Sequence, residues 1–388
     1  MKAELIDQNI VLSNDQNGVT LYNVPASETN YDVLEDEKFT AYQNGNELGQ
    51  YFYGKTTGWI NNAGNPIPDI IEWLKNPINE VIEPPPPTGE LNLDVDLLPG
   101  TLIGVAGSNG WSSSTNSWFK PYLASEFPEL TGITKTYFFL WSTDHQSGAN
   151  APGGIFWGEA DNLDCSDFVD RGLIMDGHQM ETPWLYRTDD PNNPISLHVH
   201  CMPSHPQITD VIQQTLQFTT TGGDISDPAT WGAPTVPFTR KIPSDTHLGY
   251  SEPYKRENDF IALHHTDGQQ QEFGASVSLD GVNNWTRLYD AHERYGFFPD
   301  PTKPTWGHVS NVFTDGVNDY AFSPGGGEGK MNIMRLGADY EWVEFMGSFA
   351  THPDWRDYAC YQDGNTLHIY WIAHDKRSLY HTQWEITR

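Results

Sequence analysis

The chain has 388 residues with 52 acidic and 21 basic side chains, and its formal net charge is −31. This charge opposes contact with a phosphate backbone or an anionic membrane surface, so nucleic acid is excluded as the main partner. The first residues lack the apolar core of a signal peptide and no apolar run is long enough to span a bilayer, so we expect a soluble chain made in a cytoplasm, with no membrane insertion.

The N-terminal part is predicted to be a small β module followed by a short helix. Residues 1 to about 58 contain short β-forming runs between Asn, Asp and Gly residues. From Pro66 to Ile82, apolar residues recur every three or four positions, which predicts an amphipathic helix that Pro77 should interrupt. Four successive prolines, Pro84 to Pro87, then favour a stiff extended segment.

These patterns predict a division of the chain into parts. A proline-rich surface loop within one domain is the alternative to a linker. The predicted parts are an N-terminal attachment module over residues 1–83, a proline-rich linker over 84–96 and a main domain over 97–388.

The main domain repeats one pattern: a β-rich run, a short turn of Asp, Gly or Asn, and a large aromatic residue, usually Trp. Four copies are clear, and the fifth, which ends at Trp384, is weaker. Spacings of roughly 40 to 70 residues are typical of propeller blades, in which each four-stranded sheet buries its faces against its neighbours. The runs lie at residues 154–157, 214–219, 272–278, 330–335 and 377–384.

The predicted fold class is therefore all-β, a five-bladed β-propeller preceded by the small β module, the short helix and the linker. An irregular β-sandwich is the alternative. Blade two is expected to begin near Met180. Inner strands are expected at residues 102–106, 260–263, 308–313 and 358–361, with a second strand of blade one at 137–141.

One segment points to a known family. Glu181-Thr182-Pro183 opens a β-rich run that is followed by a second run over residues 195–200, and the hairpin turn Ser278–Trp285 lies further on. These features resemble the five-bladed propellers of the family-43 glycoside hydrolases and their relatives, over most of residues 100–388. The resemblance implies that Glu181 is a general acid and that the Ser278–Trp285 turn is structural.

Glycoside hydrolysis requires a second carboxyl group across the scissile bond. In the family an Asp on the first inner strand is the base, but residues 104–110 contain no acid. Hydrolysis therefore requires another carboxylate at roughly 5 to 10 Å from an exposed Glu181, and a buried or solitary Glu181 would argue against it. The candidates near predicted strand ends are Asp144, Asp176, Glu252 and Asp357.

Histidines and cysteines are candidate ligands and catalysts. The histidines on or beside predicted inner strands are His178, His198, His200, His264, His265 and His308. They could bind a metal, or act with Tyr250 and Arg256 as a polysaccharide lyase, but packing and hydrogen bonding are more common roles. No tight ligand spacing occurs, and the three cysteines form no close pair, so no metal and no cofactor are expected.

Aromatic rings at predicted loop ends could stack on sugar faces, whereas Trp231, Trp285 and Trp342 should seal blade interfaces. The loop-end aromatics are Trp111, Trp118, Trp184, Tyr250, Trp306 and Trp355. The predicted ligand-binding residues are His178, Trp111, Trp184, Tyr250, Arg256, His308 and Arg356.

The leading functional hypothesis is a glycan-recognising propeller displayed on a virion or similar assembly. The order of module, linker and propeller resembles the fibres and spikes of bacterial viruses. It implies location in the virion, host-surface polysaccharide as ligand and virion proteins as partners of the N-terminal module, and it is compatible with a homo-oligomer. The alternatives are a polysaccharide-degrading hydrolase or lyase and a purely structural virion component.

Overall fold

The structure, a computed structural model, describes most of the second part of the chain and the strands of the first. The described residues are 2–6, 9–14, 19–25, 39–43, 46–54, 58–61, 66–67, 91–94, 100–108, 110–143, 153–176, 180–203, 205–208, 210, 212–239, 247–265, 273–290, 310–324, 330–337, 340, 343–350 and 355–387. The chain divides into two compact units, Met1–Glu90 and Leu91–Arg388. Among the described residues, no helix has the length and apolar character to cross a bilayer.

The first unit contains one seven-stranded sheet, in the order β3-β2-β1-β4-β5-β6-β7. Strands β1 and β4 are parallel and the other neighbours are antiparallel. The strands are β1 (Lys2–Ile6), β2 (Asn9–Asn14), β3 (Val19–Pro25), β4 (Phe39–Gln43), β5 (Asn46–Gly54), β6 (Gly58–Asn61) and β7 (Pro66–Ile67). This sheet agrees with the predicted β module.

The predicted helix is wrong at its start. Pro66 and Ile67 form β7, which pairs with Ile60 and Trp59 of β6. A proline is tolerated at such a position because the strand lies at the edge of the sheet, where its missing N–H is not needed. Residues 68–82 of the predicted helix, and Pro84 to Pro87, lie outside the described residues.

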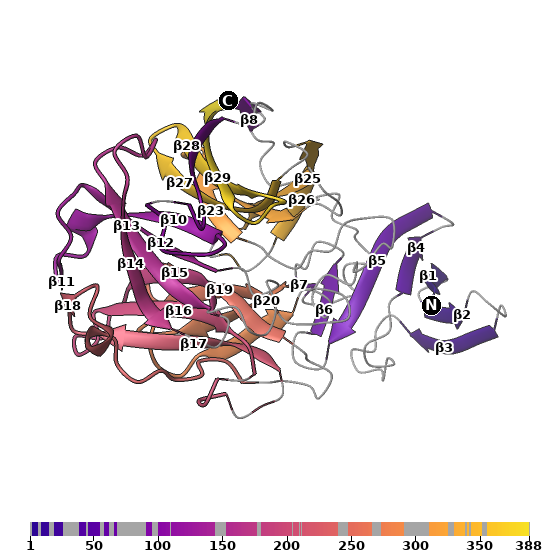
Figure 1. Cartoon of the computed structure of the whole chain (residues 1–388). Coiled ribbons are helices and arrows are strands. Elements are labelled where there is room, and N and C mark those ends of the chain that lie inside the picture. The colour runs from indigo at the N-terminus through magenta and orange to yellow at the C-terminus, as the bar shows by residue number, and fades with distance from the viewer. Residues whose placement is uncertain are drawn as a thin grey trace. The chain divides into compact units, whose positions relative to one another are not determined.

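The second unit is built from successive antiparallel meanders, of which five lie in the described residues (Figure 1). Their strands are β10 (Ser117–Leu123), β12 (Tyr137–Ser142), β13 (Gly154–Ala160) and β14 (Val169–Asp176); β15 (Glu181–Arg187), β16 (Ile195–Cys201) and β17 (Gln213–Thr220); β19 (His247–Lys255), β20 (Phe260–His265), β21 (Phe273–Ser278) and β22 (Thr286–Asp290); β23 (Ser310–Thr314), β24 (Asp319–Pro324), β25 (Lys330–Leu336) and β26 (Val343–Ala350); and β27 (Trp355–Asp363), β28 (Thr366–Ala373) and β29 (Ser378–Thr387). Short elements between them are η1 (Ala124–Glu126), β11 (Leu130–Thr131), β18 (Gly223–Asp224) and η3 (Pro228–Thr230).

The first strands of the meanders form a closed ring. Strand β10 contacts β15 and β27, β15 contacts β19, and β23 contacts β27. Strands β19 and β23 are joined by a hydrogen bond from Asn311 N to Glu252 Oε2, at 2.7 Å. In Figure 1 the meanders follow one another from magenta through orange to yellow around a common centre. This arrangement is a β-propeller, as predicted; the number of five blades stays a prediction, since parts of several meanders lie outside the described residues.

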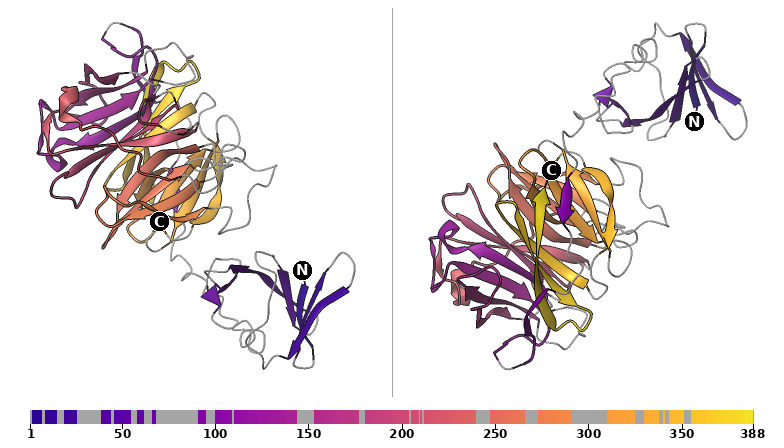
Figure 2. Two further views of the ribbon diagram at one scale, coloured as in Figure 1. Left: turned by 90° about the horizontal axis from the view of Figure 1, so that it is seen from below. Right: turned by 90° about the horizontal axis from the view of Figure 1, so that it is seen from above.

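The ring is closed by the two ends of the unit. The C-terminal strand β29 pairs on one edge with β8 (Asn92–Asp94) and β9 (Thr101–Val105), and β8 runs beside β29 in Figure 2. Residues 92–94 therefore belong to the propeller rather than to the predicted linker. Residues 102–106 were expected on the innermost strand of blade one, but that strand is β10. They lie largely on the closing strand β9.

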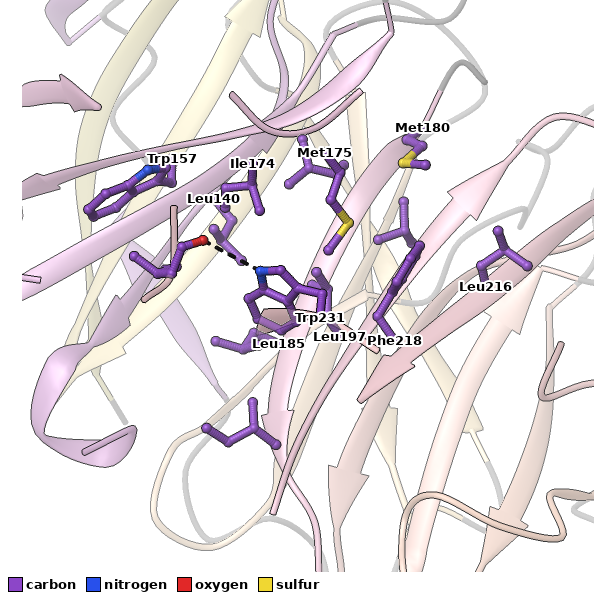
Figure 3. Packing of buried hydrophobic residues seen from close by; sticks show 14 of the residues in the cluster. Leu140, Trp157, Ile174, Met175, Met180, Leu185, Leu197, Leu216, Phe218 and Trp231 are labelled. Carbon is purple, nitrogen blue, oxygen red and sulfur yellow. Dashed lines mark hydrogen bonds between the residues drawn. The ribbon is translucent and has the colours of Figure 1, made fainter. Parts of the chain in front are cut away.

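Tryptophans seal the seams between meanders, as predicted for two of them. Trp231 is 6% exposed and packs with Leu140 of the first meander and Leu185 of the second, and its indole N–H donates to the Ile225 carbonyl (Figure 3). Trp285 lies in a core cluster shared by the second and third meanders. Trp342 lies outside the described residues. Cys165, Cys201 and Cys360 are all free and buried, in keeping with a packing role.

The Ser278–Trp285 turn has the structural role that the family resemblance implied. Ser278 Oγ donates to the Asn283 carbonyl, while Asp280 accepts from the backbone N–H groups of Val282 and Asn283. Burial opposes the ionisation of Asp280, but these hydrogen bonds outweigh it and hold its pKa at about 2. Part of the acidic excess is thus used to form turns.

Candidate functional site

Each first strand carries one extra residue relative to its partner, near its N-terminal end. The register shifts by one residue between Ser117 and Lys120, Glu181 and Trp184, Gly249 and Glu252, Ser310 and Phe313, and Trp355 and Asp357. Such β-bulges re-aim side chains and are frequent beside active sites. We call this end of the ring the bulged end.

Four of these bulges contain a non-glycine residue in the left-handed region. The residues are Trp118 (φ 55°), Thr182 (φ 48°), Tyr250 (φ 51°) and Asn311 (φ 57°). Each such conformation costs about 1–3 kcal/mol and persists where the surrounding structure imposes it, often at functional sites. The repetition of this strain in four meanders makes the bulged end the candidate functional site.

Glu181 and Tyr250 meet at this end. The Tyr250 hydroxyl donates to Glu181 Oε2 at 3.1 Å, linking β19 to β15. The Tyr250 ring stacks on His200, with centroids 4.0 Å apart and an interplanar angle of 18°. His200 Nε2 in turn lies 2.8 Å from Gln213 Oε1. A Cβ on Gly249 would collide with the His200 ring, so glycine is what allows this close approach.

Further rings surround Tyr250. The centroid of Trp118 lies 6.1 Å from that of Tyr250, and that of His265 lies 5.9 Å from it. Trp118, His200 and His265 are all buried, and Glu181 is only 3% exposed, whereas Tyr250 is half-buried. Tyr250 is therefore the member of this cluster that offers surface to a ligand.

A buried polar network lies next to this cluster. Lys120 donates to the Cys360 carbonyl at 2.9 Å, and its ammonium lies 3.9 Å from the centroid of the Trp184 ring. Glu252 Oε2 accepts from the Tyr254 hydroxyl at 2.6 Å as well as from the backbone N–H of Asn311. Burial lowers the pKa of Lys120 and raises the pKa of Glu252, and the attraction between the two charges opposes both shifts.

Several predicted ligand-binding residues are buried or lie elsewhere. Trp184 is buried beneath Lys120 and donates its indole N–H to the Pro253 carbonyl. Trp111 stacks on Phe168, in a hydrophobic cluster shared by the first and last meanders. Arg256 follows the C-terminal end of β19 and pairs with Asp259. At about 3.3 Å per residue, the strand places the backbone of Arg256 up to roughly 20 Å from that of Tyr250, so their partnership in a lyase stays a prediction that this geometry does not favour.

Other predicted residues cannot be placed in the site. His178, His308, Trp306 and Asp144 lie outside the described residues, as do the side chains of Trp355 and Arg356, whose backbone opens β27.

The remaining carboxylates differ in their surroundings. Asp176 is exposed at the end of the outer strand β14, and Glu252 is committed to the buried network. Asp357 lies at the bulge of β27, half-buried, and Ser117 Oγ of β10 donates to it at 3.3 Å. Among the described residues, Asp357 is therefore the predicted candidate that meets all three conditions. It lies at the bulged end, on a first strand, and part of its surface is exposed.

The other candidate histidines have structural partners. His198 lies between the Tyr186 hydroxyl and Ser251 Oγ, and His264 Nε2 pairs with Ser276 Oγ. Burial lowers the pKa of both histidines, to about 3 for His198, so both are neutral near pH 7. Within the described part of the chain no cluster of three or more His, Cys, Asp or Glu could hold a metal ion.

Sequence reasoning missed Lys120 and Asn311. A single lysine within the otherwise apolar and aromatic run of residues 118–123 was the available signal for Lys120, because buried lysines require partners. Asn311 had no comparable signal, since its role depends on the left-handed backbone.

Comparisons with known proteins find similarity only at the level of structure. No family model and no curated protein matches the chain. A family 117 glycoside hydrolase from the marine bacterium Zobellia galactanivorans aligns with a TM-score of 0.48 and 9% identity, over 76% of this chain and 90% of that protein. An exo-β-1,3-galactanase from Phanerochaete chrysosporium gives 0.48 and 7%, over 74% and 64%. A thermostable family-43 glycoside hydrolase gives 0.39 and 15%, over 56% and 72%. Similarity this distant does not transfer an activity.

Proposed function

We propose that the bulged end of the propeller recognises carbohydrate and that Tyr250 is its stacking platform. The observation that carries the proposal is the fixed, half-buried ring of Tyr250, held at its hydroxyl by Glu181 and at one face by His200. A ring ordered in advance loses little conformational entropy on binding. Aromatic faces suit the C–H faces of sugars, and carboxylate and imidazole groups nearby suit their hydroxyls.

Replacing Tyr250 tests this proposal. We expect Tyr250→Ala to weaken retention of a bound polysaccharide by roughly tenfold or more, because a central aromatic anchor is lost. Tyr250→Phe keeps the ring and should stay within about threefold of the wild type, since only the hydroxyl bond is removed. Affinity electrophoresis of the full chain against a panel of bacterial surface polysaccharides measures both. Equal retention by Tyr250→Ala and wild type would remove Tyr250 from the site.

A second candidate function is glycoside hydrolysis, and Asp357 is the observation in its favour. Glu181 and Asp357 lie on β15 and β27, the two strands that flank β10 in the ring, so two carboxyl groups are present at one end. Against it, Glu181 is 3% exposed, and a general acid must reach the leaving oxygen. We therefore rank hydrolysis below recognition.

Chain shortening distinguishes the two functions. If the protein is a hydrolase, Glu181→Gln and Asp357→Asn should each reduce release of oligosaccharides by about a hundredfold or more, with the polysaccharide still bound. If it only recognises glycan, no shortening should appear with the wild type. Size-exclusion chromatography of the incubated polysaccharide reads this outcome.

We further propose that the protein is displayed on a virion. The separate sheet of Met1–Glu90 supports it only as a module that could attach to other proteins while the propeller meets glycan. Cosedimentation of the full chain with assembled particles would test this role.

A further inference from the structure

One pair of oppositely charged side chains contacts the first strands of all the described meanders. Lys120 extends from β10 to the Trp184 ring of β15, to Asn311 Oδ1 of β23 at 3.5 Å and to the Cys360 carbonyl of β27. Glu252 extends from β19 and accepts from the Asn311 N–H. Asn311 Oδ1 also accepts from the Cys360 N–H at 2.7 Å. We call Lys120, Glu252 and Asn311 the axial strut.

The strut is almost completely removed from water. Lys120 is 8% exposed, Glu252 3% and Asn311 1%. Lys120 and Glu252 attract each other as opposite charges and are joined through Asn311. Removing one of two such buried charges is costly because the other charge is left uncompensated, whereas replacing both with neutral groups is often tolerated. The strut therefore restrains the relative positions of the strands that it joins.

The strut lies next to the two aromatic residues of the candidate site. Lys120 is two residues from Trp118 on β10, and Glu252 is two residues from Tyr250 on β19. The Trp118 indole also favours the ionised form of Glu252, while its ring packs beside Tyr250. A change in the strut is thus transmitted to both bulges over a few bonds.

We propose that Lys120 is a positioning residue that, through Glu252 and Trp118, holds the Tyr250 ring in its binding orientation. It does not contact the ligand. The part of this inference that concerns glycan affinity rests on the proposed function, but the part that concerns the orientation of Tyr250 does not.

Nitration of Tyr250 tests the orientation directly. Tetranitromethane modifies accessible tyrosines, and peptide mass spectrometry assigns the modified residue. In the full chain, Lys120→Met should raise the rate of Tyr250 nitration about tenfold, because local opening around the ring becomes easier. The double variant Lys120→Met/Glu252→Gln leaves no unpaired charge, so it should fold even if the single variant does not, and it should show the same rise.

Glu159→Gln is the matched control. Glu159 is also fully buried and bound to an arginine, Arg171, but it faces Phe138 at the other end of the same sheet. The Glu159→Gln variant should lower the midpoint temperature of thermal unfolding and leave Tyr250 nitration within about twofold of the wild type. Folded Lys120 variants with wild-type nitration of Tyr250 would overturn the inference.

Glycan retention separates this inference from the proposed function. If the wild type binds a polysaccharide, the Lys120 variants should bind it about tenfold more weakly and Glu159→Gln should not. If the wild type binds none, the proposed function fails, while increased nitration in the Lys120 variants alone would still support the positioning role.

Discussion

Gly100→Ala is expected to destabilise the propeller by about 3 kcal/mol or more, since the substitution strains the backbone and overpacks the closing seam. Gly100 has φ +74°, and a Cβ there would collide with the backbone carbonyl of His381 on β29. This contact lies where β9 begins to pair with β29 and closes the ring. A backbone carbonyl within a ladder cannot move aside as a side-chain tip can. Guanidinium unfolding followed by tryptophan fluorescence measures the change.

Gly110→Ala is the control for backbone strain alone. Gly110 has φ +93°, and no atom lies within 4 Å of a Cβ placed there. This variant should lose only about 1 kcal/mol, the cost of forcing alanine into a positive φ. Equal losses in the two variants would show that the closing contact at His381 contributes nothing beyond strain.

Acidification from pH 7 to pH 4 is expected to lower the free energy of unfolding steeply, in part through His381. His381 and His368 are buried in the closing sheet, with Nε2 of one 3.0 Å from Nδ1 of the other. Burial and the neighbouring His368 lower the pKa of His381 to about 4, although Asp164 opposes this shift. Tyr370 packs against its ring. Protonating both histidines would place two N–H groups against each other.

The sign follows from proton uptake. The unfolded chain binds this proton near pH 6.5 and the folded chain only near pH 4, so unfolding takes up a proton between these values. The free energy of unfolding therefore falls as the pH is lowered from 6.5 to 4. One such group contributes about 1.4 kcal/mol per pH unit, or about 3 kcal/mol over the window. His198, with its pKa lowered by burial to about 3, adds a loss of the same sign.

The contribution of His381 is measurable from variants. Unfolding curves at pH 4, 5, 6 and 7 should show a slope that is smaller in His381→Gln than in the wild type by about one proton. His374→Gln, at an exposed position on the same hairpin, is the control for removing a histidine from this hairpin. If His381→Gln retains the wild-type slope, this histidine is not the acid-sensitive group.

Local patterns in the sequence determined the β class, the repeating units and the turns. The Ser278–Trp285 turn could be predicted because its hydrogen bonds join residues only a few positions apart. Alternation and turn spacing likewise predicted the meanders, and Trp231 and Trp285 at the seams, because these features depend on which face of a strand is apolar. The predicted helix is wrong at Pro66 and Ile67 because an apolar period alone does not exclude a strand that has a partner to pair with.

Only the tertiary structure decided which side chains meet. Tyr250 and Glu181 are 69 residues apart in the chain, and the strut joins Lys120 to Asn311 across 191 residues. Their contacts depend on ring closure and on the bulges. The positive φ angles in the bulges redirect the side chains, and no residue pattern predicts these angles. Arg256 shows the converse: it is near Tyr250 in sequence, but an extended strand separates them. Burial of Glu181 is likewise a product of several strands packing together, and it places recognition ahead of hydrolysis.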